Sequence, residues 1–235
     1  MTNTRVRPTK PRPRRKAASR DMRDDASLKA AVIEAALPHV PFDGFTDTVL
    51  EDAAAEAGVD ARDVPRLFPD GPLSLVEALS EAADREMETR LAKARLGAMK
   101  IRERIAKAIR TRIDILRPHK EAARRAAAFL TLPPHAARGM TILYRTVDAI
   151  WRAAGDTSTD FNFYTKRAIL AAVYSATLMR WFTDDSDDEA ETEAFLAHRI
   201  DDVMRFERFK AQIRARTSKL PSLADILRGA PARRS

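Results

Sequence analysis

Apolar residues recur every three or four positions along most of the chain, from residue 27 to about residue 215. This spacing places them on one face of an α-helix, whereas a half-buried strand would alternate apolar and polar residues. No stretch of the sequence alternates in that way convincingly. The pattern therefore predicts an all-α protein.

Prolines and glycines divide the pattern into successive helices. Ser27 can cap a first helix that ends before Pro38, and Thr46 or Asp47 can start a second helix that ends at Gly58. The further predicted helices cover residues 61–68, 75–96, 101–113, 121–132, 140–154, 161–182 and 195–213.

The segment 161–182 is apolar on nearly every face, which predicts a helix buried in the centre of a domain. Its longest apolar run, residues 168–182, is interrupted by Ser175, Thr177 and Arg180. That run is shorter than the ~20 residues that a helix needs to cross a bilayer. The sequence therefore predicts no membrane span.

The net charge of +8 comes from the first residues of the chain. Residues 1–20 hold eight basic residues and no acidic ones, so the other 34 of the 42 basic residues balance the 34 acidic ones. With three prolines and few apolar side chains, residues 1–26 are expected to form a solubilising, disordered arm. Contact of the arm with anionic lipid or nucleic acid is the alternative. Secretory and mitochondrial signals both fit this segment poorly.

Motifs for catalysis and for metal or cofactor binding were not found in the sequence. There is no cysteine, no two glycines lie close together, and no histidine has di-iron or zinc-protease spacing. Asp184, Asp185, Asp187 and Asp188 lack the glycine and glutamate of a calcium loop, which favours a solvated turn. We therefore expect a protein without catalytic residues, metal or cofactor, in a reducing cytoplasm; an unusual enzyme is a further possibility.

Residues 53–59, followed by Leu67, Phe68, Pro69 and Leu75, resemble the helix-turn-helix unit of TetR-type repressors. A DNA-reading helix needs basic residues for the phosphates and residues such as Asn or Gln for the bases. The corresponding segment 60–66 has two arginines and two aspartates, and Asp70 follows it. We expect a TetR-like bundle that does not bind nucleic acid. A ligand-responsive transcriptional regulator of the TetR class is the alternative.

Two blocks, residues 36–45 and 155–167, resemble the ubiquinone (coenzyme Q) biosynthesis protein-nine family. Residues 100–105 and 148–152 are similar to the same family, and the resemblance extends over about residues 28–210. It implies a TetR-like, lipid-binding homodimer that assists the hydroxylase acting on demethoxyubiquinone. The partner-binding patch implied by the second block consists of Asp160, Phe163, Tyr164 and Arg167. Phe163 stands where the family usually has a tryptophan, which alters the expected partner contact.

The resemblance also implies a hydrophobic tunnel for an isoprenoid quinone precursor or a phospholipid. Apolar and aromatic residues of the two central helices are its candidate lining: Leu143, Val147, Ile150, Trp151, Tyr174, Leu178 and Trp181. The periodicity alone fits equally a core in which these side chains pack against one another.

The C-terminal residues 216–235 carry a short apolar stripe bordered by basic residues: Leu220, Leu223, Ile226 and Leu227. This pattern suits a helix that lies peripherally on an anionic membrane, and a frayed tail or packing on a partner are the alternatives. The predicted organisation is a basic arm at 1–26, a helix-turn-helix-like unit at 27–82, a lipid-binding and dimerisation domain at 83–215, and this tail.

Overall fold

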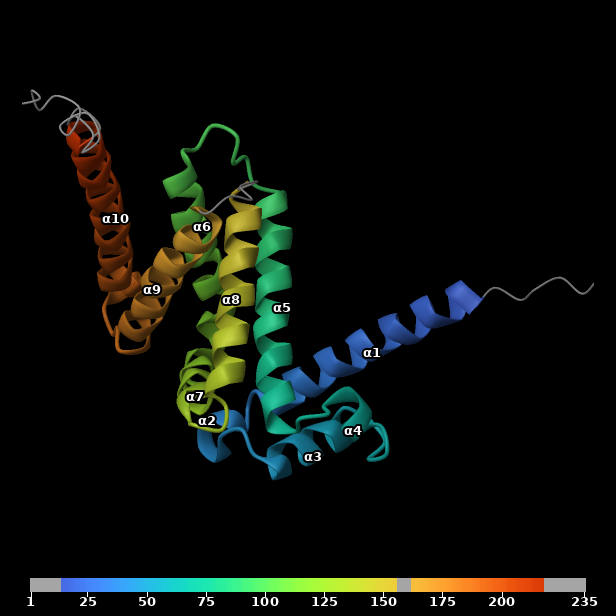
Figure 1. Ribbon diagram of the computed structural model, residues 1–235. Helices are drawn as coiled ribbons and strands as arrows, with labels where there is room; N and C mark the ends of the chain where they lie inside the picture. The colour runs from blue at the N-terminus through green and yellow to red at the C-terminus, as the bar shows by residue number, and fades with distance from the viewer. Residues whose placement is uncertain (1–13, 156–161, 218–235) are drawn as a thin grey trace, which may run out of the picture. The chain divides into compact units, whose positions relative to one another are not determined.

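The computed structural model describes residues 14–155 and 162–217, with side chains described over 25–155 and 164–205. In these ranges every regular element is a helix, which confirms the predicted all-α class (Figure 1). The elements are α1 (Arg14–Ala36), α2 (Val40–Asp43), α3 (Asp47–Glu56), α4 (Val64–Leu67), α5 (Pro72–Ala92), α6 (Ile101–Leu116), η1 (Arg117–His119), α7 (Lys120–Thr131), α8 (Ala136–Ala153), α9 (Asn162–Phe182), η2 (Asp187–Glu189) and α10 (Ala190–Thr217).

The chain divides into two compact units that are not continuous in sequence. The first unit comprises Met1–Lys93 and Thr111–Thr146, and the second comprises Ala94–Arg110 and Val147–Ser235. This division differs from the predicted boundary at residue 82, because α7 packs against α2 and so returns to the N-terminal helices. The helices α6 and α8 each contribute residues to both units.

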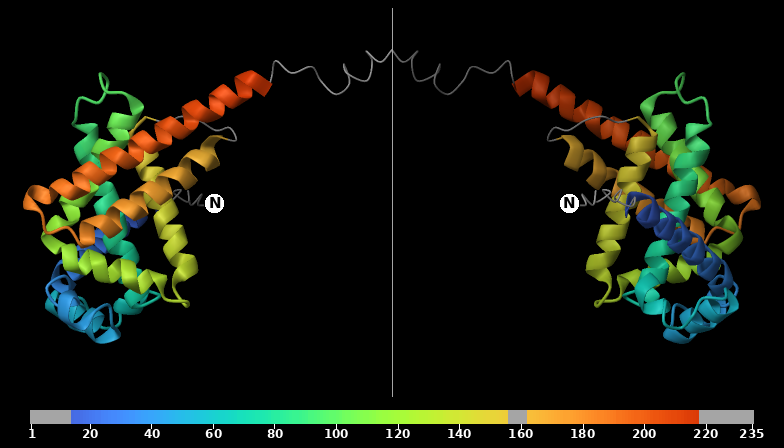
Figure 2. Two further views of the ribbon diagram at one scale, coloured as in Figure 1. Left: turned by 90° about the vertical axis from the view of Figure 1, so that its left-hand side faces the viewer. Right: turned by 90° about the vertical axis from the view of Figure 1, so that its right-hand side faces the viewer.

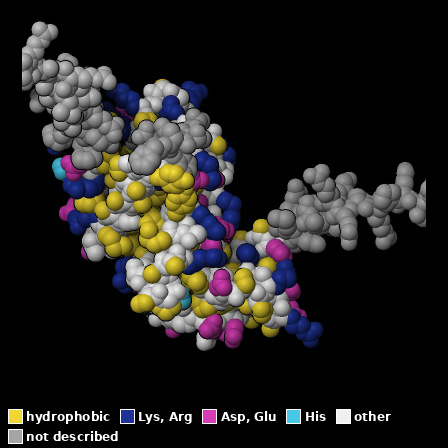
Figure 3. Space-filling view, viewed as in Figure 1, with side chains coloured by type: hydrophobic (Ala, Val, Ile, Leu, Met, Phe, Trp, Pro, Cys, Tyr) yellow, Lys and Arg dark blue, Asp and Glu magenta, His cyan; other side chains and the backbone are white. Residues whose placement is uncertain are grey.

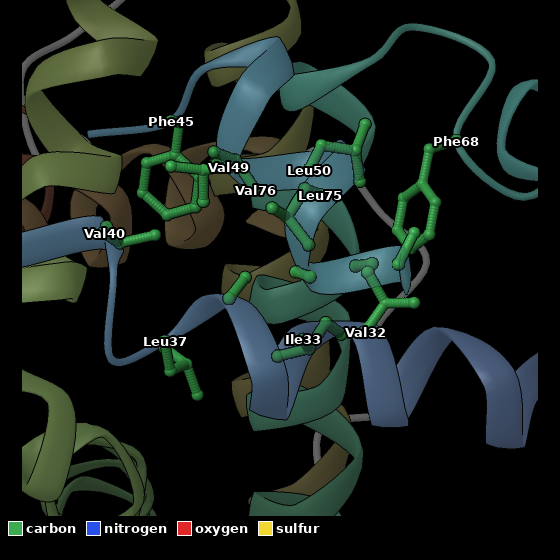
Figure 4. Packing of buried hydrophobic residues seen from close by; sticks show 14 of the residues in the cluster. Val32, Ile33, Leu37, Val40, Phe45, Val49, Leu50, Phe68, Leu75 and Val76 are labelled. Carbon is green, nitrogen blue, oxygen red and sulfur yellow. The ribbon is translucent and has the colours of Figure 1, made fainter. Parts of the chain in front are cut away.

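The core of the first unit forms where α1 packs on α3 and α5. The buried side chains that meet there are Val32 and Ile33 from α1, Val49 and Leu50 from α3, and Leu75 and Val76 from α5 (Figure 4). Burying each aliphatic side chain of this kind contributes about 1.5–3 kcal/mol. The apolar residues that recur every three or four positions in the sequence thus form the buried faces of these helices.

Local capping residues set the ends of α3 as the sequence predicts. The Thr46 hydroxyl accepts a hydrogen bond from the backbone N–H of Val49 at 3.3 Å, which satisfies one free donor of the first turn. After the helix, Gly58 adopts a φ of +70°, a conformation that other residues rarely adopt. The chain can therefore turn sharply toward α4.

The second helix of the helix-turn-helix-like unit is short. The sequence predicts a helical segment over 61–68, whereas α4 covers only Val64–Leu67. Its basic side chain, Arg66, is engaged in ion pairs with Asp25 at 2.6 Å and with Asp63 at 3.2 Å. The predicted shape of the unit is present, with its second helix reduced to about one turn.

A buried network of polar side chains joins three helices within the first unit. The Arg112 guanidinium on α6 donates to the Asp84 carboxylate on α5 at 2.6 Å and to the Ser80 hydroxyl at 2.9 Å. The Thr146 hydroxyl on α8 donates to the other oxygen of Asp84 at 2.9 Å. Each polar group therefore has a partner, as burial requires.

The predicted disordered arm over residues 1–26 is wrong for its second half. Residues 1–13 lie outside the described part of the chain, but α1 begins at Arg14. No proline or glycine follows Pro13 within α1, and Ala17, Ala18 and Ala26 are strong helix formers. The packed part of α1 can therefore continue as a helix toward the N-terminus.

The second unit contains α9, which packs on α10, as Figures 1 and 2 show. The prediction that α9 is buried on all faces is wrong, because Tyr164, Ala168, Ala172 and Met179 are exposed. A helix that packs on one side leaves the opposite side in solvent even when its residues are apolar. Among the described residues, no helix is long and apolar enough to cross a membrane.

Candidate functional site

Most of the predicted lipid-binding residues lie in the second unit, at the end of α8 and along α9. Val147, Ile150, Trp151, Tyr174 and Trp181 are buried there, and Leu178 is half-buried. Leu143 is half-buried and belongs to the first unit. These positions suit an apolar interior, and their role as a lipid lining stays a prediction.

An ion pair fixes the start of α9 against the end of α8. The Arg167 guanidinium donates to one oxygen of the Asp148 carboxylate, at 2.8 Å from Nε and 2.6 Å from Nη2. Only 5% of Arg167 is exposed, so its charge is buried, and the Asp148 carboxylate compensates it. Arg152, one turn further along α8, donates to the second Asp148 oxygen at 2.9 Å.

The predicted partner-binding residues have different surroundings. Tyr164 is 69% exposed and is available on the surface, whereas Arg167 turns inward to Asp148. Asp160 lies outside the described residues, and Phe163 lies on α9 with its side chain outside them. The predicted membrane residues Leu220, Leu223, Ile226 and Leu227 also lie outside the described part. The partner-binding patch therefore stays a prediction. Of its two residues with described side chains, Tyr164 is exposed and Arg167 is buried.

The exposed side of α9 is uncharged and mostly apolar between Ala168 and Met179, with Ser175 as its polar member. Tyr164, Ala168, Ala172 and Met179 follow one another at helical spacing along this side. Hydrophobic side chains are visible on the surface over α9 in Figure 3. Tyr164 therefore stands at one end of a neutral strip rather than alone.

Trp151 and Lys166 connect the same two helices close to this ion pair. The Lys166 ammonium lies 5.5 Å from the centre of the Trp151 ring, within the range of a cation–π interaction. Trp151 is 8% exposed, and its indole N–H has no hydrogen-bond partner in the described structure. An apolar ring with a buried polar N–H is thus present among the predicted lipid-binding residues.

Arg104 holds the C-terminal end of α8. Its guanidinium donates to the backbone carbonyls of Met99, Gly97 and Ala154, at 2.9, 3.3 and 3.2 Å. Gly155 follows with a φ of +86°, and a Cβ there would lie 3.2 Å from Nη1 of Arg104. Glycine therefore suits position 155 for two reasons: it adopts the positive φ without strain, and it leaves space for the Arg104 side chain.

The acidic turn between α9 and α10 is structural rather than only solvated. Asp184 is buried and accepts hydrogen bonds from the Ser186 hydroxyl at 2.5 Å and from the Thr192 backbone N–H at 2.7 Å. These bonds hold the pKa of the Asp184 carboxyl well below its ordinary value. Beside it, the Trp181 indole N–H donates to Glu189 at 2.6 Å. The turn thus fixes how α10 starts after α9.

Sequence reasoning missed the positioning residues of this region, Asp148, Lys166 and Arg104. All three lie in the blocks that resemble the family, but no local pattern shows their contacts, because Asp148 and Arg167 are 19 positions apart on different helices. Within the described residues, no group of three or more His, Cys, Asp or Glu side chains is arranged to hold a metal ion. The side chains found here position helices and surround an apolar interior.

Comparison with known protein families matches the segment that contains Asp148 and Lys166. A family model described as COQ9 matches residues 136–207. The chain is 31% identical over 201 residues to human "Ubiquinone biosynthesis protein COQ9, mitochondrial", covering 83% of this chain and 63% of that protein. The Drosophila melanogaster protein of the same name is 29% identical over 195 residues, covering 81% of this chain and 60% of that protein. The chain thus spans just under two thirds of the length of these relatives.

Comparison with solved structures supports the fold. A crystal structure of a TetR transcriptional regulator from Nitrosomonas europaea matches with a TM-score of 0.60, covering 74% of this chain and 96% of that chain. The sequence identity is 19%, so the match concerns the fold alone. The predicted TetR-like helical bundle is confirmed.

Proposed function

Because the chain is a relative of the ubiquinone biosynthesis proteins COQ9 and carries their domain over residues 136–207, we propose that it serves ubiquinone biosynthesis as a non-enzymatic accessory protein. It binds an isoprenoid quinone precursor and presents it to the hydroxylase that acts on demethoxyubiquinone. The observation that carries this proposal is the position of the matched segment: α8 and α9 lie within it, with Trp151, Tyr174 and Trp181 in their buried faces.

The physical basis of binding is burial of an apolar tail. Each CH₂ group removed from water contributes about 0.8 kcal/mol, so one five-carbon isoprenoid unit contributes about 4 kcal/mol before the costs of ordering. Recognition of such a tail needs apolar surface rather than a dense set of polar contacts. The apolar faces at the end of α8 and along α9 are the surfaces that we assign to it.

Presentation to a partner is assigned to the exposed side of α9. Tyr164 is an amphipathic ring on the surface, and rings of this kind are enriched at protein interfaces. The Asp148–Arg167 ion pair holds the first turns of α9 and so fixes the direction of Tyr164. Arg167 therefore acts in the proposed patch as a positioning residue.

The lipid assignment is tested by native mass spectrometry of the purified full chain. We expect a homodimer that carries copurified isoprenoid or phospholipid and binds added ubiquinone with two isoprenoid units. Leu178→Glu, on α9, should abolish binding, whereas Leu132→Glu, at an exposed position of the first unit, should not. A lipid-free wild-type protein that also fails to bind the added quinone contradicts the proposal.

The partner assignment is tested with the hydroxylase in a pull-down experiment. Tyr164→Ala should weaken the complex, while Tyr144→Ala, which removes a tyrosine exposed on the first unit, should leave it intact. Equal losses for the two variants would contradict the role of α9. Conversion of the quinone precursor by this protein alone would show that it is an enzyme.

We place the protein in the cytoplasm, with peripheral contact to a membrane through the C-terminal apolar stripe. A protein can extract a lipid from a bilayer only if some part of it approaches the bilayer surface, and basic residues around an apolar stripe suit that contact. Sedimentation with anionic vesicles, compared between the full chain and the variant Leu223→Glu, tests this assignment.

The TetR-type regulator is the second candidate, favoured by the structural match. Against it stand the four-residue α4, the ion pairs that occupy Arg66, and the aspartates at positions 60, 63 and 70. Affinity for DNA depends on cations that displace counterions from phosphates, and acidic neighbours oppose this. Selection from random duplexes should enrich no sequence, and enrichment of a palindrome would reverse this ranking.

A further inference from the structure

The two tryptophans of the chain satisfy their indole N–H groups differently. Both lie in the second unit, and both are buried. The Trp181 N–H donates to the Glu189 carboxylate at 2.6 Å. The Trp151 N–H is buried without any hydrogen-bond acceptor within reach in the described structure. One ring therefore has a complete set of contacts, and the other has a donor left over.

A buried donor without a partner is uncommon and needs an explanation, because it loses its bond to water and gains nothing in return. Arg110 and Arg199 also have a buried Nε without a hydrogen bond of good geometry. Each of these guanidinium groups, however, forms an ion pair, with Glu193 and with Asp202. An indole has a single donor, so Trp151 has no such compensation.

The charges near Trp151 favour an acceptor that is rich in electrons. The Lys166 ammonium lies 5.5 Å from the ring centre. Asp148, three residues before Trp151 on α8, is already engaged by Arg152 and Arg167. Among the described side chains, the cations Arg152, Lys166 and Arg167 thus surround one carboxylate, and an oxygen with partial negative charge would be stabilised beside the indole N–H.

We propose that Trp151 is the polar contact of the lipid site: its indole N–H donates a hydrogen bond to a ring oxygen of a quinone or phenol head group. This inference rests on the proposed function and adds the residue that distinguishes a head group from a plain hydrocarbon tail. The ring of Trp151 supplies apolar surface, and its N–H supplies the specificity. Lys166 strengthens the contact through its charge.

The test compares Trp151→Phe with wild type in binding two probes of equal length. The first probe is ubiquinone with two isoprenoid units, and the second is an isoprenoid hydrocarbon without oxygen. Loss of one buried hydrogen bond should weaken quinone binding about tenfold and leave hydrocarbon binding unchanged. Tyr144→Phe, which removes one donor at the exposed side of α8 in the first unit, is the control and should bind both probes as wild type does.

Nuclear magnetic resonance of the indole N–H groups gives a readout that packing alone would not move. Wild type has two such signals, and Trp151→Phe removes one and thereby assigns both. The Trp151 signal should shift downfield with the quinone, as expected for a new hydrogen bond, and stay in place with the hydrocarbon. A phospholipid with an anionic phosphate is the third probe, and it should not reproduce the shift.

Each remaining outcome separates this inference from the proposed function. If wild type binds neither the quinone nor the hydrocarbon, the proposed function fails and the inference falls with it. If the quinone binds but Trp151→Phe binds it equally well and the Trp151 signal stays in place, only the inference is overturned. A shift caused by the phospholipid instead would reassign the donor to a phosphate and would also overturn it.

Discussion

The two units of this protein differ in how completely their buried polar groups are paired. In the first unit, Arg112, Asp84 and Thr146 satisfy one another across three helices. In the second unit, Arg167 and Asp184 are paired as well, but the Trp151 N–H is buried without a partner in the described structure, and α9 exposes an uncharged side. The contrast indicates that the first unit is optimised for a single packed state, whereas the second keeps unsatisfied surface for a ligand and a partner.

The largest expected effect comes from breaking the network of the first unit. Asp84→Ala should lower the free energy of unfolding by about 3–5 kcal/mol, because the buried Arg112 charge would lose the carboxylate with which it pairs. Denaturant unfolding measures this loss. The control Glu86→Ala removes an exposed pair with Arg90 and should cost less than about 1 kcal/mol. An equally small effect of Asp84→Ala would contradict the contrast between the units.

The corresponding change in the second unit should be smaller. Asp148→Ala removes a carboxylate partner of the buried Arg167, and we expect a loss of about 2–3 kcal/mol, because Asp148 is itself partly exposed. Arg152→Ala removes only the solvent-exposed partner of the same carboxylate and should change stability by less than about 1 kcal/mol. If both variants unfold at the same denaturant concentration, Arg167 does not depend on Asp148.

A third change tests the turn between α9 and α10 through its pH dependence. The pKa of Asp184 is lowered in the folded state, so its carboxylate stabilises the protein above the ordinary value of 3.8 and loses this effect as the pH falls below it. Asp184→Asn cannot ionise. The stability difference between wild type and Asp184→Asn should therefore be constant at neutral pH and shrink below about pH 4. Thermal unfolding followed over pH 3–7 measures it, and a pH-independent difference would contradict the assignment.

The smallest effect is expected at the proposed partner surface. Tyr164→Ala should change the free energy of unfolding by no more than about 0.5 kcal/mol, because its side chain lies mostly in solvent. Thermal unfolding checks this directly. A loss of several kcal/mol would place Tyr164 in a packed core and would remove the distinction between the exposed side of α9 and the first unit.

Local sequence signals predicted the helices well. The isoleucines at 101, 105, 109 and 113 mark α6, and Thr46 and Gly58 mark the limits of α3, because stripes and caps depend on neighbours a few positions away. The all-α, TetR-like class follows from these elements. The start of α1 was missed, because the same alanines and basic residues are compatible with a helix or with an arm.

The site could be predicted only as a region. That Tyr164 is exposed while Arg167, three residues later, is buried depends on Asp148 in another helix. The exposed side of α9 was missed for the same reason. A continuous apolar sequence does not determine how many faces of the helix will be covered by neighbouring helices. Contacts between residues far apart in the sequence determine both the burial of Arg167 and the exposure of one side of α9. Such contacts cannot be derived from a single sequence.

The shortness of α4 has an evolutionary consequence. Four residues of α-helix rise about 6 Å, whereas the major groove that a reading helix must occupy is about 12 Å wide. Replacing the aspartates by arginine or asparagine would change the charge of this segment, whereas operator recognition also needs a longer helix than α4. Any descendant of this chain that acquired operator recognition would therefore have to change two properties of the segment between Asp60 and Pro69, its charge and the length of its helix.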